Sequence, residues 1–68
     1  MNADIYLHSG AIATVTNLSK VKEMLRNTQT QEYTDFSDLE FLDDCVYAFV
    51  GSNTVVVPGK HILYINFA

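Results

Sequence analysis

The chain is short and acidic: its 68 residues are nearly half hydrophobic, and eight carboxylates face four basic side chains, for a net charge of −4. A chain of this length is expected to form one domain, residues 1–68, whose core yields only a few kcal/mol of net stability. The negative charge has the wrong sign for holding a phosphate backbone, which argues against direct nucleic-acid binding.

Cysteine usage and the first residues indicate a cytoplasmic protein with no membrane association. Cys45 has no second cysteine to bridge to, which fits a reducing compartment. The N-terminal sequence has neither the basic region nor the apolar stretch of a signal peptide, and no apolar run is long enough to cross a bilayer. Because neither a disulfide nor a zinc site can add stability, we expect the chain to gain it by oligomerisation.

The chain is expected to begin with a β-hairpin. Residues 4–8 alternate apolar and polar side chains, and residues 11–15 resume an extended pattern rich in β-branched residues. Gly10 lies between them, and a glycine can take the positive φ that a tight connection requires. The two segments are therefore predicted to pair as antiparallel neighbours.

The next segment is predicted to be the one helix of the chain. Thr16 or Asn17 can accept an amide hydrogen bond as the N-cap, and Asn27 can end the helix in a left-handed conformation. Residues 28–32 show no periodicity and are interpreted as a connector. Four apolar residues at helical spacing form the predicted buried stripe: Leu18, Val21, Met24 and Leu25.

The segment 33–44 mixes acidic and large apolar residues, and its pattern leaves two conformations open. Apolar residues three positions apart fit a short helix, whereas alternation over residues 39–42 fits a strand, which we favour. Residues 43–44 then form the turn into the next strand.

The last third of the chain is predicted to form three consecutive strands, at residues 45–50, 54–57 and 61–67, joined by turns at 51–53 and 58–60. The expected fold class is α+β: a ββα unit followed by a three- or four-stranded antiparallel meander, with one helix packed on one mostly antiparallel sheet.

These last strands are apolar on both faces, and one short helix can cover only one face of a sheet. Two arrangements are open: the sheet closes into a small barrel, or its second face packs against a symmetric copy. We favour the second and predict a homo-oligomer. The residues expected to self-associate are Tyr47, Phe49, Leu63, Ile65 and Phe67.

No set of residues in the sequence carries recognisable catalytic chemistry. His8 and His61 each lie near a predicted turn and are expected to be partly exposed. The acidic neighbours of Cys45 raise the pKa of its thiol, which favours a buried structural thiol over a nucleophile. We therefore predict no enzyme, and no catalytic, cofactor-binding or metal-binding residue.

Six carboxylates lie between residues 32 and 44 without one basic residue. The ordinary interpretation of such a run is a solvated surface. The functional interpretation is a docking surface for a basic protein partner, because a field of one sign speeds the encounter with an oppositely charged protein. The predicted partner-binding residues are Asp35, Asp38, Glu40, Asp43 and Asp44.

Residues 5–12 and 54–65 resemble a layout common in small proteins encoded by phages and mobile elements. That layout opens with a strand, a turn containing glycine and a second strand, and it closes with an apolar strand, a proline, a turn and an Ile-x-Tyr-Ile strand. The resemblance implies a small regulator or inhibitor of host machinery, and it transfers no functional residue.

The leading functional hypothesis is a non-enzymatic, homo-oligomeric interaction module that acts by protein contact. The alternative is a small-ligand-binding protein, with a site between subunits or at the mouth of a small barrel. That alternative site is expected to be lined by side chains with a polar end, namely Tyr6, Tyr64, His8 or His61.

Overall fold

The computed structural model of the chain describes residues 1–25, 30–37 and 39–68. These residues form seven β-strands and one 3₁₀ turn, η1 (Gly59–His61), and they contain no α-helix. The strands are β1 (Ala3–Leu7), β2 (Ile12–Val15), β3 (Lys20–Leu25), β4 (Thr30–Tyr33), β5 (Cys45–Val50), β6 (Thr54–Pro58) and β7 (Ile62–Phe67).

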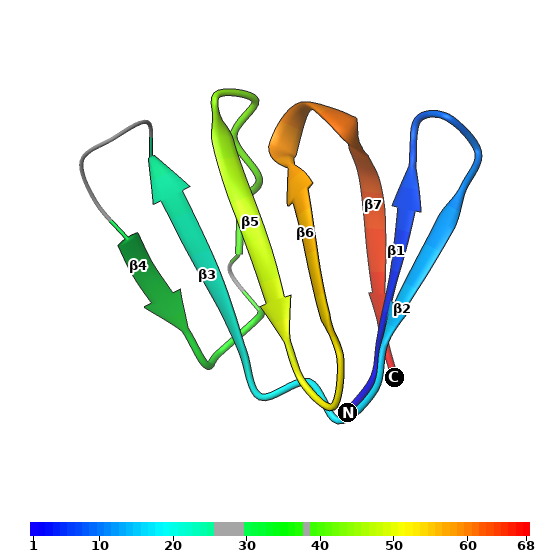
Figure 1. Cartoon of the computed structure of the whole chain (residues 1–68), viewed down its shortest axis with the longest axis vertical. Helices are drawn as coiled ribbons and strands as arrows, with labels where there is room; N and C mark the ends of the chain where they lie inside the picture. Colours follow the sequence, from blue (N-terminus) through cyan, green and yellow to red (C-terminus); the bar gives the residue numbers. More distant parts are fainter. Residues whose placement is uncertain (26–29, 38) are drawn as a thin grey trace.

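The strands form two antiparallel sheets (Figure 1). The three-stranded sheet has the order β2-β1-β7, and the four-stranded sheet has the order β4-β3-β5-β6. The first and last strands are neighbours, and the pairing continues past them: the Asn2 N–H donates to the Ala68 carbonyl at 2.6 Å, and the Ala68 N–H donates to the Asn2 carbonyl at 2.8 Å. Both ends of the chain therefore lie side by side.

The predicted helix is wrong, because residues 20–25 form β3 in the interior of the four-stranded sheet. β3 pairs with β4 along one edge and with β5 along the other. The buried side chains of β3 are those of Val21 and Glu23. Because one of them is polar, the alternation of apolar and polar residues that is typical of a strand is not visible in the sequence. Asn17 has a φ of 52° and turns the chain before β3; Asn27, the predicted helix end, lies outside the described residues.

The interpretation of the neighbouring segments is also corrected. The predicted connector contains β4, whose residues are polar and mostly exposed because it is an edge strand with little to bury. The strand favoured for residues 39–42 does not form, and the described parts of the segment 34–44 are irregular. The turn predicted at residues 43–44 is confirmed, with the Cys45 N–H donating to the Leu42 carbonyl at 3.2 Å.

The first hairpin and the last three strands are confirmed, but the meander is not. β1 pairs with β2, and β5 pairs with β6, both antiparallel. After β6 the chain turns through η1 and crosses to the other sheet, where β7 pairs with β1. The α+β class with one helix on one sheet is therefore replaced by an all-β arrangement of two sheets.

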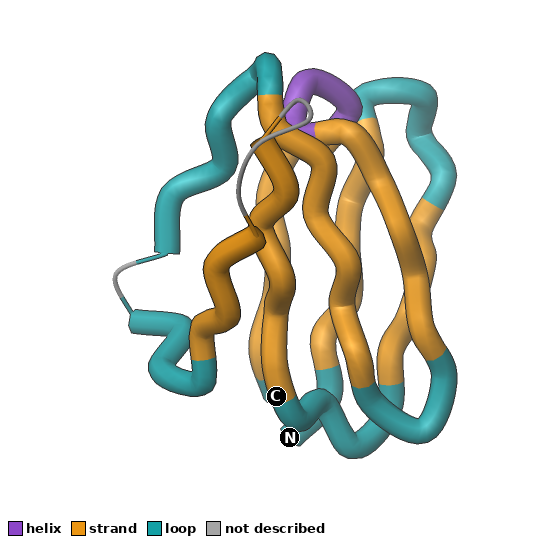
Figure 2. The backbone as a smooth tube through the Cα atoms, turned by 60° about the vertical axis from the view of Figure 1, so that its left-hand side comes forward, coloured by secondary structure: helices purple, strands orange, loops and turns teal. Residues whose placement is uncertain are grey.

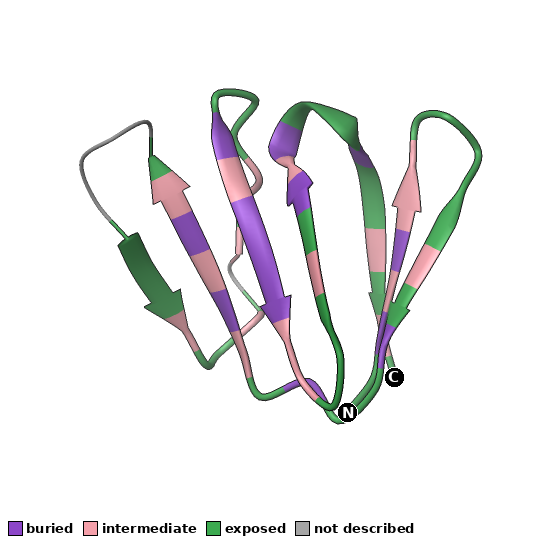
Figure 3. Cartoon of the chain, in the orientation of Figure 1, coloured by how far each residue is buried: buried purple, intermediate pink, exposed green. Residues whose placement is uncertain are grey.

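The core lies between the inner faces of the two sheets, as expected for packed sheets with alternating side chains. β5 is the most deeply buried strand, and Tyr47 and Phe49 on its inner face are fully enclosed (Figure 3). Ile5 and Val15 face them from the three-stranded sheet. The second sheet of the same chain therefore covers the apolar face that a symmetric copy was expected to cover.

A side-chain clamp joins the two sheets at one end. Asn53, in the β5–β6 loop, donates from its side-chain amide to the Thr14 carbonyl at 2.9 Å and accepts from the Thr16 N–H at 3.0 Å. The side-chain amide thus makes the same pair of hydrogen bonds to the backbone at and just after β2 that the backbone of a paired strand would make. A Cβ on Gly51 would collide with the Thr16 carbonyl, so only glycine allows this close approach.

The described parts of the segment 34–44 run as an outer layer along one side of the strands (Figure 2). Phe36 stacks on Phe67 with ring centroids 5.4 Å apart, and Phe41 meets Tyr47 edge-on at 4.9 Å. The Leu42 N–H also donates to the Tyr47 hydroxyl at 2.7 Å. These contacts fasten an irregular, acidic segment onto the core.

Candidate functional site

An exposed aromatic row crosses the outer face of the three-stranded sheet. The strand register places Ile12, Tyr6 and Tyr64 side by side on β2, β1 and β7. The two tyrosine rings stack, with centroids 4.4 Å apart and planes 11° apart. Ile12 is 58% exposed and Tyr64 is 53% exposed, whereas Tyr6, between them, is half-buried. We call these three residues the aromatic face.

The row next to the aromatic face is polar. The register places Thr14, Asp4 and Asn66 side by side, and the Thr14 hydroxyl donates to the Asp4 carboxylate at 2.9 Å. The one carboxylate of this row is therefore held by a neighbour within the sheet. The three residues of the aromatic face are themselves uncharged, so two such faces can meet without a like-charge contact at their centre.

The outer face of the four-stranded sheet has a different composition. Lys20 and Glu32 form an ion pair of 3.1 Å across β3 and β4, and Lys22 lies on the same face. Val56 on β6 is 59% exposed, almost the same as Ile12. This second face therefore combines apolar residues with charged ones.

The residues predicted to self-associate lie in three different environments. Tyr47 and Phe49 are enclosed by the chain's own atoms, so they are not accessible to a second copy in this fold. Ile65 and Phe67 are half-buried and pack against the core. Leu63 alone is well exposed, at 54%, in β7.

The two histidines of the chain, which were weighed as site residues, are joined through their backbones. The His8 N–H donates to the His61 carbonyl at 3.0 Å, and both residues are exposed. Across residues 1–25, 30–37 and 39–68, no group of three or more His, Cys, Asp and Glu residues is placed to hold a metal ion.

Cys45 is a free, buried thiol, as its sequence context predicts. Burial raises the pKa of the thiol most, and the carboxylates of Glu23 and Asp44 raise it further. The reactive thiolate form is therefore disfavoured at neutral pH.

The predicted partner-binding carboxylates are spread over several features. Asp35 accepts hydrogen bonds from the Ser37 hydroxyl at 2.8 Å and the Ser37 N–H at 3.1 Å, which lower the pKa of its carboxyl group. Asp43 and Asp44 lie exposed in the turn before β5, and Glu40 lies at the mouth of a pocket. Asp38 lies outside the described residues.

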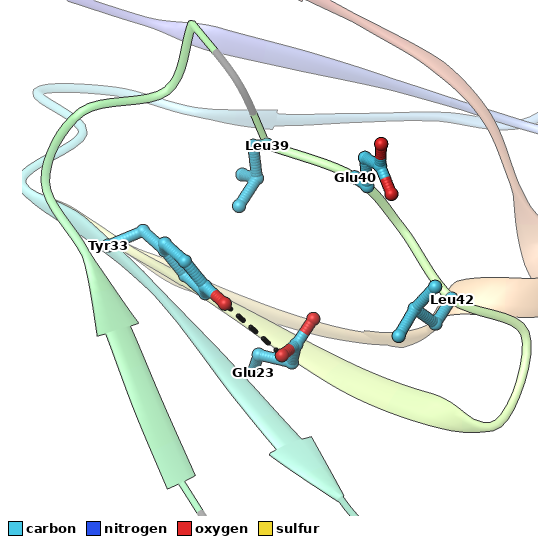
Figure 4. A pocket seen from close by; sticks show the side chains of 5 residues that line it. All are labelled: Glu23, Tyr33, Leu39, Glu40 and Leu42. Carbon is cyan, nitrogen blue, oxygen red and sulfur yellow. Dashed lines mark hydrogen bonds between the residues drawn. The ribbon is translucent and has the colours of Figure 1, made fainter.

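That pocket, which we call the Glu23 pocket, has a volume of about 230 Å³ and lies between the inner face of β3 and the segment 39–42. Glu23 lines it although this carboxylate side chain is only 9% exposed. Figure 4 shows Glu23 and Leu39 directed into the same space, with Glu40 farther out. The pocket is lined by Glu23, Tyr33, Leu39, Glu40 and Leu42.

Two tyrosine hydroxyls surround the Glu23 carboxylate. The Tyr47 hydroxyl donates to Oε2 at 2.7 Å. The Tyr33 hydroxyl lies 3.3 Å from Oε1 and 2.8 Å from the Gln31 side-chain oxygen, so its single proton serves one acceptor at a time. Burial, and then the Glu23 carboxylate, raises the pKa of both tyrosines, which keeps their hydroxyls protonated and able to donate.

Sequence reasoning missed Glu23 as a site residue. A lone glutamate between Val21 and Leu25 is ordinarily assigned to a solvated position. The buried position of Glu23 could have been inferred from alternation along residues 20–23. The two lysines mark the outward face of a strand, which puts Val21 and Glu23 on its inward face.

A second hollow, of about 430 Å³, lies beside Phe36, Phe67 and Met1. Neither this hollow nor the Glu23 pocket is lined by the residues of the predicted ligand site, which were Tyr6, Tyr64, His8 and His61.

The chain was compared with protein-family models, curated proteins and solved structures, and none of them matches. The resemblance to phage- and mobile-element-encoded proteins therefore stays a prediction. Within the part of the chain that the structure describes, no helix is long and apolar enough to cross a membrane.

Proposed function

We propose that this protein is a non-enzymatic interaction module whose copies associate through the aromatic face. The observation that supports the proposal is the row of Ile12, Tyr6 and Tyr64 on three neighbouring strands, with Ile12 and Tyr64 exposed and Tyr6 half-buried between them. Tyrosine is enriched in the cores of protein interfaces, because it offers a large apolar surface at a small cost in conformational entropy.

Energetic considerations favour occupation of this face. Removing one large apolar side chain from water stabilises a structure by about 1.5–3 kcal/mol, and Ile12 and Tyr64 are both more than half exposed here. The small size of the domain leaves little stability from other sources. A second copy brings an identical uncharged row, so a symmetric pairing buries apolar surface on both partners.

Two matched variants test the proposal. Ile12→Lys places a charge in the aromatic face, whereas Val56→Lys places the same charge at an equally exposed position on the other sheet. Each change reduces the net charge of −4 by one unit, so long-range repulsion is the same in both variants. Circular dichroism checks that both remain folded.

The measurement is sedimentation velocity at micromolar concentrations. We expect the wild type and Val56→Lys to move from the 7.6 kDa of one chain towards twice that mass as concentration rises, while Ile12→Lys stays at one chain. A wild type that remains monomeric throughout, or two variants that behave alike, would contradict the proposal.

A further inference from the structure

Glu23 is a buried carboxylate, and no described residue forms an ion pair with it. Among the described residues the one ion pair joins Lys20 to Glu32, on the opposite face of the sheet from Glu23. Removing a carboxylate from water costs several kcal/mol unless a positive charge or strong hydrogen bonds compensate it. Tyr47 and Tyr33 supply neutral donors only, so the described part of the chain provides no positive charge to the Glu23 carboxylate.

The walls of the Glu23 pocket match the parts of an arginine side chain. Leu39 and Leu42 offer apolar surface for the methylene stem, and the ring of Tyr33 lies beside the space, where a planar cation can stack. Glu23 supplies a carboxylate at depth, and Glu40 adds a second one at the mouth. We propose that the Glu23 pocket binds the guanidinium group of an arginine presented by a partner protein.

Guanidinium fits this site better than ammonium for two physical reasons. It is planar and weakly hydrated, so it stacks on an aromatic ring and loses less hydration on burial. It also carries several N–H donors in a fixed fork, which suits a carboxylate whose two oxygens each lie within hydrogen-bond distance of a tyrosine hydroxyl.

The volume and charge of the site favour a protein side chain over a free ligand. The pocket is smaller than the roughly 300–1,000 Å³ of pockets that enclose drug-sized molecules, and it suits a single side chain. Asp43 and Asp44 lie exposed shortly after Leu42 in the sequence, and their charge attracts a basic partner. The aromatic face lies on the other sheet, so this site does not depend on the proposed self-association.

The test titrates N-acetyl-arginine amide into the ¹⁵N-labelled protein and follows amide shifts by NMR. We expect saturable shifts centred on Glu23, Tyr33 and Leu42, and binding weaker by about tenfold or more for the uncharged citrulline analogue. Equal binding of the citrulline analogue, or of N-acetyl-lysine amide, would overturn the assignment of guanidinium.

Variants locate the site. Glu23→Gln keeps the size of the side chain and removes its charge, and Glu40→Gln does the same at an exposed position where folding is not at risk. Both should weaken binding of the arginine probe, Glu23→Gln by about tenfold or more and Glu40→Gln by less. The matched control Glu32→Gln, on the outer face, should bind like the wild type. Unchanged binding in both pocket variants would overturn the proposal.

Two further variants distinguish arginine binding from self-association and from a contact within the chain. Ile12→Lys should bind the probe like the wild type even if it abolishes self-association, so the two proposals can fail independently.

Arg26 is the only arginine of the chain, and it lies outside the described residues. Binding by Arg26→Gln alone, and not by the wild type, would show that the pocket serves the chain's own arginine and would overturn the role of a partner.

Discussion

The two sheets distribute their polar and aromatic side chains in opposite ways. The three-stranded sheet is apolar on its inner face, with Ala3 and Ile5 fully buried, and on its outer face it carries Tyr64, which is exposed and stacked on Tyr6. The four-stranded sheet places Tyr47 and the Glu23 carboxylate inside and an ion pair outside. The two sheets therefore differ in chemistry, with an apolar outer surface on one and a pocket containing a carboxylate beside the other.

The same contrast shows how a tyrosine's surroundings determine its role. Tyr47 is enclosed, and its hydroxyl both accepts from the Leu42 N–H and donates to Glu23. Tyr64 is about half exposed, and its ring stacks on that of Tyr6. The first side chain is therefore expected to contribute to folding, and the second to contact with other molecules.

The largest expected effect is on β5, where the inner face supports the fold. Phe49→Ala should lower the free energy of unfolding by about 3–5 kcal/mol, because it leaves a cavity between the two sheets. Val56→Ala, on the exposed side of β6, should lower it by less than about 1 kcal/mol. Urea unfolding followed by circular dichroism measures both; similar losses would mean that inner and outer faces are wrongly assigned.

A smaller effect is expected from removing the hydroxyl of the buried tyrosine. Tyr47→Phe leaves the Leu42 N–H without its acceptor and Glu23 without its closest donor, which should cost about 1–3 kcal/mol of stability. Tyr64→Phe is the control, since its hydroxyl belongs to an exposed side chain, and it should change stability little. Equal midpoints in thermal unfolding for the two variants would contradict the contrast between the sheets.

The smallest expected effect is a change in alkaline stability. The folded-state pKa of Tyr47 lies above its ordinary value of 10.0, so as pH rises through 10.0 the unfolded chain releases this proton while the folded chain retains it. Stability should therefore fall above that pH, by no more than about 1.4 kcal/mol per pH unit for one proton. Comparing wild type and Tyr47→Phe from about pH 8 to about pH 11 isolates this contribution, which the variant should lack. Parallel curves would show that Tyr47 titrates normally.

The sequence was sufficient for the strands whose side chains alternate or are uniformly apolar, such as β1 and β5. It was insufficient for β4, because Thr30, Gln31 and Glu32 on an exposed edge carry no hydrophobic pattern. The prediction for β3 was wrong because Glu23 interrupts the apolar side of the strand, and spacing of three and four then fits a helix. The pairing of β7 with β1 joins opposite ends of the chain, and local patterns contain no information about such a contact.

The candidate sites were predictable only in part. Alternation already placed Tyr6 and Tyr64 on definite sides of their strands, but which side faces water depends on the sheet that covers the other. The acidic segment was recognised from its charge, yet its link to Glu23 arises from folding against β3. The partner surface predicted at Asp35, Asp38, Glu40, Asp43 and Asp44 stays a prediction. Of these residues, Glu40 lines the Glu23 pocket.

The most direct test of the contrast between the two outer faces is a concentration series of two-dimensional amide NMR spectra of the wild type. Shifts and broadening that grow with concentration should cluster on β1, β2 and β7, around Tyr6, Ile12 and Tyr64. Changes centred instead on Lys22 and Val56, or spectra that do not change with concentration at all, would contradict self-association through the aromatic face.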